Sequence, residues 1–497
     1  MEDRSSPSTS EATLGEGSLS TIHAVGQSLA VGPIFSVGLL SGLVAGFAGV
    51  STPASVLLAT IGALALAYLV SLYARRFAGA GAIYEYLFHT GGSVVGVFSG
   101  GLYFIGMLLI QGSFAIGWGF LANGFWAEHI SSSPPAFWVF GVIYLAVIAL
   151  MNYFGVKLAV RGVLVLAAVS CIPLILLAVV IIAKGGAEGQ SLSAFSPFAG
   201  DSSGILNGVL FAVTLFIGFE AAASIAEETK EPRRSIPLAV ISTVAIVAVF
   251  YLLMTYAMSI GFGAEGIEGW AGSPSPLGSL AETYVGNWLA TIIGLVILFD
   301  MLSAGLAFSV TGCRGVFALA RDGFLPRPLA STSRWGTPVG GVVAMSVVGA
   351  AVLIWGATNH LGDKVELPNS YQAFTVLVGA GSFIVEAIYV LLALAGLRLV
   401  YQLGNGARDW WRYFIVLIAL ALPLLAFKGA LDPWPKSPEI GIYIAFGALA
   451  LAVVWVIALM VTRPEVVRGA AQHAVAEHEL TMGPESVEQL DPPALRP

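Results

Sequence analysis

Val31-Gly32-Pro33-Ile34-Phe35 interrupts the first long apolar stretch of this chain near its middle, and Ile217-Gly218-Phe219-Glu220 interrupts a later one in the same way. A continuous helix uses its backbone N–H and C=O groups in its own hydrogen bonds, whereas a broken helix leaves several of them free. In a membrane, such free groups are tolerated only inside protein or along a cavity. Two interrupted spans therefore predict a solute-binding site near the bilayer midplane.

The composition places the rest of the chain in a membrane. Of the 497 residues, 57% are hydrophobic and only 10% are charged, whereas soluble domains carry about 25% charged residues. Apolar runs of about 20 residues, enough to cross the hydrocarbon layer, begin near residues 23, 53, 93, 135, 160, 204, 235, 286, 337, 369, 411 and 439. We therefore expect an all-α polytopic membrane protein with about twelve transmembrane helices.

The distribution of Lys and Arg predicts the orientation, because short cytoplasmic loops collect these residues. With the N-terminus inside, eighteen of the 22 basic residues fall on the cytoplasmic side. We expect a multi-pass protein of the cell membrane with both termini in the cytoplasm. Its predicted parts are a disordered tail over residues 1–20, an integral transporter domain over 21–462 and a disordered tail over 463–497.

The positions of the two breaks predict an internal repeat. Spans one to five and spans six to ten each open with a broken helix. A unit with an odd number of spans reverses its direction in the membrane, so the second unit is expected to be inverted relative to the first. The predicted architecture is a 5+5 inverted repeat followed by two extra C-terminal helices.

Three segments resemble the amino acid-polyamine-organocation (APC) superfamily, in particular its bacterial amino acid permeases. Residues 226–237 (AEETKEPRRSIP), together with Phe219-Glu220, resemble the family signature at the end of span six. Residues 78–86 (AGAGAIYEY) resemble its first cytoplasmic loop, and residues 313–326 (CRGVFALARDGFLP) resemble its loop after span eight. With the span count, the resemblance covers about residues 20 to 460.

The resemblance implies the LeuT-like fold, first described for sodium-coupled amino acid transporters, and a secondary active transporter. Such a permease would move an amino acid by alternating access, as a symporter with H+ or Na+ or as an antiporter. The alternative within this class is a permease for polyamines or other organic amines. An alternative of a different class is a channel or a ligand sensor built on the same fold.

The first break departs from the family pattern, which is often Gly-Ser-Gly, because Val31-Gly32-Pro33 stands there. Free N–H groups at a helix N-terminus suit a carboxylate, and proline has no N–H to offer. Either the remaining amides around Gly32, Ile34 and Phe35 suffice for a substrate carboxylate, or the substrate lacks one. The alternative to a binding site is that the Gly-Pro pair merely kinks the helix.

Three acidic residues lie deep in apolar spans, where a charge costs about 2.5 to 3.5 kcal/mol. Glu220 is expected to couple protons, to meet an ammonium group or to clamp the second break. Asp300 is expected near the binding site, against the alternative of a buried structural carboxylate, and Glu386 fits either a gate or helix packing. The predicted substrate-binding residues are Val31, Gly32, Pro33, Ile34, Phe35, Phe216, Ile217, Gly218, Phe219, Glu220, Ala221 and Asp300.

Candidates for ion coupling are Glu220, Asp300, Ser303, Ser309 and Ser170. The two hydroxyls of span eight, Ser303 and Ser309, could join a sodium site near the first break, although hydroxyls in spans more often bond to backbone carbonyls. Proton-coupled relatives carry a lysine in span five, and Ser170 aligns with it here. Exchange without any ion is the remaining alternative.

Short matches to enzyme motifs lack the surroundings that a catalytic site needs. Residues 200–204 (GDSSG) match a nucleophile elbow, but they precede a membrane helix instead of following a strand. The six histidines fall at span ends, in loops or in the tail, and the chain has no Gly-Lys-Ser/Thr phosphate loop. The sequence therefore predicts no enzyme, no cofactor, no metal and no nucleic-acid partner. The expected partners are a small-molecule substrate, H+ or Na+, and the lipid bilayer.

Overall fold

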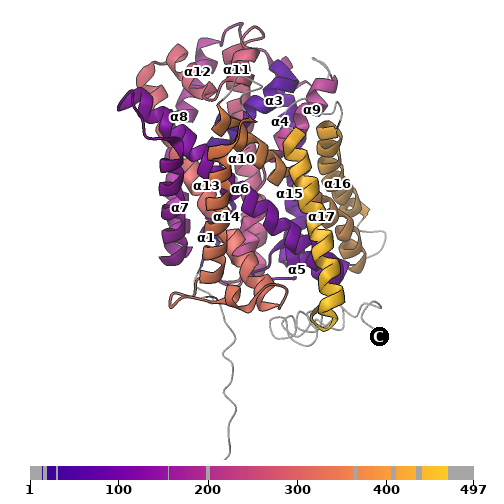
Figure 1. The fold of residues 1–497 in the computed structure, drawn as a ribbon. Coiled ribbons are helices and arrows are strands. Elements are labelled where there is room, and N and C mark those ends of the chain that lie inside the picture. The colour runs from indigo at the N-terminus through magenta and orange to yellow at the C-terminus, as the bar shows by residue number, and fades with distance from the viewer. Residues whose placement is uncertain are drawn as a thin grey trace, which may run out of the picture.

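The structure is a computed structural model, and it describes residues 14, 19–29, 32–154, 156–196, 202–361, 368–403, 410–431 and 439–467. Val31 and most of the two predicted tails lie outside the described residues. Every long element that the structure describes is a helix (Figure 1). The transmembrane elements are α1 (Thr21–Ser28), α2 (Pro33–Phe35), η2 (Ser36–Leu40), α3 (Ser41–Ala48), α4 (Thr52–Ala74), α6 (Ser93–His129), α7 (Phe137–Phe154), α8 (Val156–Lys184), α9 (Ser202–Thr214), η5 (Phe219–Ile225), α10 (Pro232–Phe262), α13 (Asn287–Arg321), α14 (Val339–Thr358), α15 (Asn369–Gln402), α16 (Trp410–Leu431) and α17 (Glu439–Thr462).

The span count agrees with the prediction. Within the described residues, eleven stretches are long and apolar enough to cross a membrane, and the first of them, Thr21–Ala74, is 54 residues long. At 1.5 Å per residue this stretch is about 80 Å long, enough for two crossings. It divides at Gly49, whose φ of +56° ends α3 just before α4 begins. Counted in this way, the described residues supply twelve stretches that can cross a membrane.

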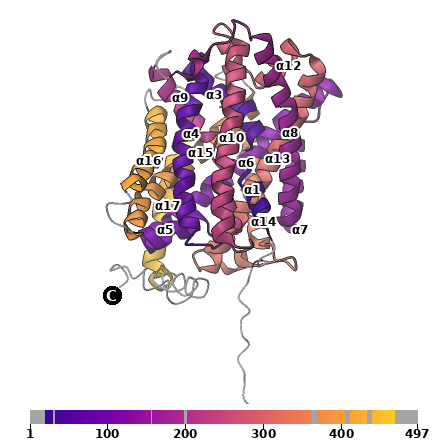
Figure 2. The same ribbon diagram turned by 180° about the vertical axis from the view of Figure 1, so that it is seen from behind.

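The two five-span units run in opposite directions, as predicted. Span one begins with α1 at the lower end of the bundle in Figure 1, whereas span six begins with α9 at the upper end. A short helix, α5 (Ile83–Gly91), follows the second span at the lower end, and α11 (Ile267–Gly272) and α12 (Pro276–Tyr284) follow the seventh span at the upper end (Figures 1 and 2). The two extra helices, α16 and α17, pack against α15.

Small residues bring α6 and α15 close together beside the breaks. A Cβ added to Gly381 on α15 would lie 3.1 Å from the carbonyl oxygen of Gly106 on α6, so the two backbones are nearly in contact. Such pairs of small residues are the usual way for membrane helices to pack, because lipid supplies no hydrophobic drive between them. From these two helices, the hydroxyls of Tyr103 on α6 and Tyr389 on α15 both reach Glu220 in the second break.

Candidate substrate site between the two broken helices

The first span is broken where the sequence predicts. α1 ends at Ser28, Gly32 adopts a left-handed φ of +55°, and the helix resumes in α2 with Pro33 at its first position. Proline suits this position because the first N–H groups of a helix have no partner within it. A Cβ on Gly32 would lie only 2.8 Å from the Cβ of Ala304 on α13. The first break is therefore pressed against α13 where only glycine fits.

The free N–H groups of the first break point at a carboxylate of the protein itself. The Oδ2 atom of Asp300, on α13, accepts hydrogen bonds from the backbone N–H of Ile34 at 3.0 Å and of Phe35 at 2.7 Å. The Asp300 side chain is 1% exposed. Because a helix N-terminus attracts anions, this is the place where the sequence predicts a substrate carboxylate. Asp300 occupies it in this structure.

The sixth span is also broken as predicted. α9 ends at Thr214, Gly218 adopts a φ of +107°, and the chain continues as the 3-10 helix η5 instead of a regular α-helix. The two breaks touch, because the Ser28 hydroxyl donates to the carbonyl of Phe219 at 2.7 Å. The other predicted residues of this segment, Phe216, Ile217 and Ala221, are all buried.

Glu220 ties the second break to two neighbouring helices. Its Oε1 accepts from the Tyr103 hydroxyl at 3.1 Å, and its Oε2 accepts from the Tyr389 hydroxyl at 2.8 Å and from the N–H of Gly218 at 3.2 Å. The side chain is 0% exposed. Of the roles that the sequence leaves open for Glu220, this geometry favours the clamp that holds the unwound segment in shape.

The remaining candidates are not gathered at one place. The hydroxyl of Ser309 accepts from the amide of Asn152 on α7 at 3.2 Å, so it faces a different helix from the first break. Ser303 and Ser170 are buried on α13 and α8. Glu386 is buried on α15, and among the described residues neither of its carboxyl oxygens has a hydrogen-bond partner. The structure therefore brings Asp300 and Glu220 to the breaks, but not Ser309.

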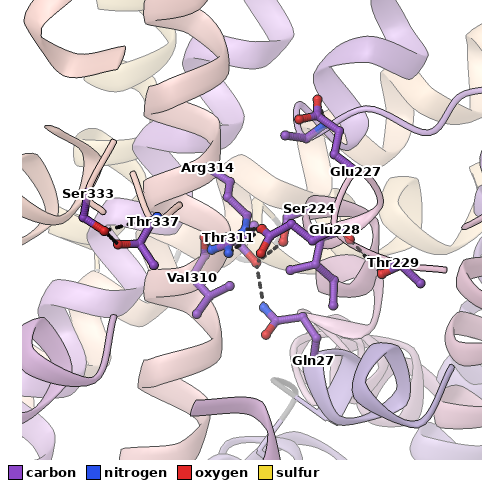
Figure 3. Close-up of polar contacts among 12 residues, drawn as sticks. Gln27, Ser224, Glu227, Glu228, Thr229, Val310, Thr311, Arg314, Ser333 and Thr337 are labelled. Carbon is purple, nitrogen blue, oxygen red and sulfur yellow. Dashed lines mark hydrogen bonds and ion pairs between the residues drawn. The ribbon is translucent and has the colours of Figure 1, made fainter. Parts of the chain in front are cut away.

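A polar layer that the sequence analysis missed lies next to the breaks and joins three spans. The side-chain amide of Gln27 on α1 donates to the carbonyl of Ala307 at 2.9 Å and to the Thr311 hydroxyl at 3.3 Å, both on α13 (Figure 3). The hydroxyl of Ser224 on η5 lies 3.3 Å from the same Thr311 hydroxyl. The feature of the sequence that could have revealed this layer is Gln27, because a side-chain amide is unusual within an apolar span.

The segments that carry the family resemblance meet at the end of the bundle where α1 begins, here named the α1 end. The guanidinium Nε of Arg314 donates to Glu228 Oε1 at 2.7 Å, and both side chains are buried (Figure 3). The backbone of Leu19, just before α1, pairs with the same segment through hydrogen bonds to Glu228 and Lys230. An ion pair without access to water is held only if both charges are partnered in this way.

A second set of contacts joins residues 78–86 to the same end. Glu227 pairs with Arg321 at 3.2 Å and accepts from the backbone N–H of Ala80 at 2.7 Å. Tyr84 donates to Asp322 Oδ2 at 2.7 Å. Burial raises the pKa of the Tyr84 hydroxyl well above its ordinary value, and the Asp322 carboxylate raises it further, so this hydroxyl stays protonated as a donor. Four separate segments are thus locked together at the α1 end.

Comparison with known proteins agrees with this architecture. The sequence profile of a family described as amino acid permease matches residues 17–462. The branched-chain amino acid permease BcaP of Bacillus subtilis is 24% identical over 419 residues, which cover 75% of this chain and 87% of that protein. The methylthioribose transporter of Bacillus subtilis is 26% identical over 382 residues, which cover 70% of this chain and 77% of that protein. A solved structure of a mutant manganese transporter from Eremococcus coleocola shares the fold, with a TM-score of 0.54 at 13% identity over 92% of this chain and 98% of that chain.

Proposed function

This chain belongs to the amino acid permease family, and on that premise we propose that it binds one amino acid between its two breaks and moves it by alternating access. The chain is a secondary transporter of amino acids and not an enzyme. One observation carries the location of the site: two helices broken at left-handed glycines touch each other through Ser28 and Phe219 in the middle of the bundle. Broken helices supply the free backbone groups that polar solutes need inside a bilayer.

The proposed substrate has an apolar side chain. Phe35, in the first break, packs edge to face against Phe114 at 4.9 Å and against Phe374 at 6.0 Å between ring centroids. Among the described residues, no Lys, Arg or His side chain forms an ion pair with Asp300 or Glu220. An apolar surround favours an apolar side chain, and it agrees with the likeness to a permease named for branched-chain amino acids.

The second candidate substrate is an organic amine without a carboxylate. The observation that favours it is the occupation of the N–H groups of Ile34 and Phe35 by Asp300. If that carboxylate is permanent, a substrate carboxylate finds no donors at the first break, and an ammonium group would meet a negative charge there. The absence of an N–H at Pro33 points the same way.

We propose that the contacts of the α1 end form the cytoplasmic gate. Because this end carries most of the basic residues, the positive-inside rule assigns it to the cytoplasm together with both termini, in the cell membrane. The Arg314–Glu228 and Arg321–Glu227 pairs join spans six and eight within the second unit. The hydrogen bonds from Ala80 to Glu227 and from Tyr84 to Asp322 join this cluster to the first unit. Opening toward the cytoplasm would require the hydrogen bonds between the two units to break, so these contacts would be present in the closed gate and absent in the open one.

Uptake into proteoliposomes tests the proposed function. Labelled amino acids and polyamines are offered with a pH gradient or a sodium gradient imposed separately, with protein-free liposomes as the control. Saturable, gradient-driven uptake of an apolar amino acid, with counterflow, is the expected result. Accumulation of carboxylate-free amines alone would select the second candidate. Flux that neither saturates nor shows counterflow would indicate a channel, and binding without flux would indicate a sensor.

A further inference from the structure

Asp300 holds the two N–H groups that an amino acid's carboxylate would use. We propose that Asp300 is an internal competitor for the substrate carboxylate, which leaves these donors as a neutral acid when substrate binds. Each substrate molecule would then bring one proton into the site. This inference rests on the proposed function, because it requires a substrate with a carboxylate, and it adds the coupling ion and the residue that carries it.

The donors at the first break cannot serve two carboxylates at once. Both N–H groups, of Ile34 and Phe35, already converge on a single oxygen, Asp300 Oδ2. The preceding residue, Pro33, has no N–H to add as a third donor. A substrate carboxylate placed at the same helix N-terminus beside an ionised Asp300 would put two negative charges next to each other in a medium of low dielectric constant. One of the two carboxylates must therefore leave or become neutral.

A proton is the available way to neutralise Asp300. Among the described residues, no basic side chain pairs with it. The titratable groups that interact with it are the Cys171 thiol on α8 and the Tyr251 hydroxyl on α10, which are neutral in their ordinary forms. Glu220 on η5 is turned toward its two tyrosines. A buried carboxylate that loses its donors without gaining a cation takes up a proton.

The residues of α8 that lie at this site carry no charge. Cys171 on α8 interacts with Asp300, and the residue before it, Ser170, is buried and uncharged. A hydroxyl group cannot offset a buried negative charge as an ammonium group could. Within the described residues, the first break therefore holds an acid without a basic partner.

The proposed cycle balances charge and protons without any covalent step. In the empty state, ionised Asp300 accepts from the two backbone N–H groups. On binding, Asp300 gains one proton and the zwitterionic amino acid gives its carboxylate to the same N–H groups. On release, the proton leaves and Asp300 returns to its donors. One zwitterion and one proton move together, so the net transfer is one positive charge.

Calorimetric titration of the purified protein tests the inference. Titrating the transported amino acid in buffers of different ionisation enthalpy gives the number of protons taken up. The wild type is expected to take up one proton per amino acid, with a dissociation constant that tightens by up to about tenfold for each unit by which the pH is lowered. Asp300→Asn is expected to bind with no proton uptake and no pH dependence. It should keep counterflow while losing accumulation driven by a pH gradient.

The control variant is Glu282→Gln, which removes an exposed carboxylate on α12 and should behave as the wild type. Amino acid binding without proton uptake in the wild type, or undiminished proton uptake in Asp300→Asn, would overturn the inference while leaving amino acid transport standing. If the wild type binds only carboxylate-free amines, the proposed function fails first and the inference fails with it.

A measurement on the wild type alone covers the case in which Asp300→Asn does not fold. The carboxamide of the transported amino acid carries no negative charge, so it can bind without neutralising Asp300. Its binding is expected to take up no proton and to vary little with pH, in contrast to the parent amino acid. Equal proton uptake with both ligands would overturn the inference.

Discussion

Each broken helix meets one buried carboxylate, and the two carboxylates are held in different ways. Asp300 reaches the first break from α13 and accepts there from two backbone N–H groups. Glu220 belongs to the second break and accepts from hydroxyls on α6 and α15 as well as from its own segment. N–H groups at a helix N-terminus can donate to any anion. Donors that come from three separate elements match only the carboxylate that links them, which here is Glu220. The first break is therefore open to exchange and the second is fixed.

Replacing each carboxylate by alanine gives the largest expected effects and the most direct test of this difference. Glu220→Ala leaves three buried donors without an acceptor, at about 1–3 kcal/mol each, so we expect it to lose roughly 5 kcal/mol of stability and all transport. Asp300→Ala leaves two backbone donors unpaired and should cost about 2–4 kcal/mol. A substrate carboxylate can replace the acceptor in the second case but not in the first.

The measurement is thermal unfolding of the purified protein in detergent, with and without the transported amino acid. Ligand should restore much of the lost stability of Asp300→Ala, and the ligand-induced rise in melting temperature should exceed that of the wild type. Glu220→Ala should show no such rescue. Equal rescue of both variants, or of neither, would show that the two breaks are not distinct in the way proposed.

Gly32→Ala is expected to have the next largest effect, because it disturbs the first break without touching a carboxylate. Its φ of +55° strains any residue with a Cβ, and the Cβ would lie 2.8 Å from that of Ala304. The backbone strain and the steric clash together should lower the free energy of unfolding by about 3 kcal/mol and move the first break away from Asp300. The matched control is Gly379→Ala on α15, where a Cβ meets nothing within 4 Å. A loss of stability in the control as large as that of Gly32→Ala would refute the explanation.

The sequence was sufficient to predict both breaks, because glycine and proline in the middle of an apolar run act locally. The same holds for the twelve spans, since each depends only on a run of apolar residues. The inverted repeat followed from counting spans, and the opposite ends at which α5 and α12 lie agree with it.

The partner of each buried acid could not be predicted, because it depends on how distant helices pack. Asp300 lies 266 positions from Ile34 in sequence, and the close packing of Gly32 against α13 accompanies their contact. The sequence likewise contained Glu228 and Arg314 in separate motifs, 86 positions apart, without indicating that they form one pair. Polar residues in apolar spans mark where to look, but their contacts follow from the tertiary structure.

Removing single hydroxyls gives the smallest effect and tests whether Glu220 is held by its tyrosines. Tyr389→Phe takes away a hydrogen bond to a buried carboxylate, which should cost about 2 kcal/mol and lower the melting temperature. Tyr144→Phe is the matched control: its hydroxyl is equally buried, but among the described residues it has no hydrogen-bond partner. Removing an unpaired buried hydroxyl should leave stability unchanged or raise it. If both variants lose the same stability, the Tyr389 hydroxyl contributes no more than an unpaired hydroxyl does. Glu220 would then not act as a clamp.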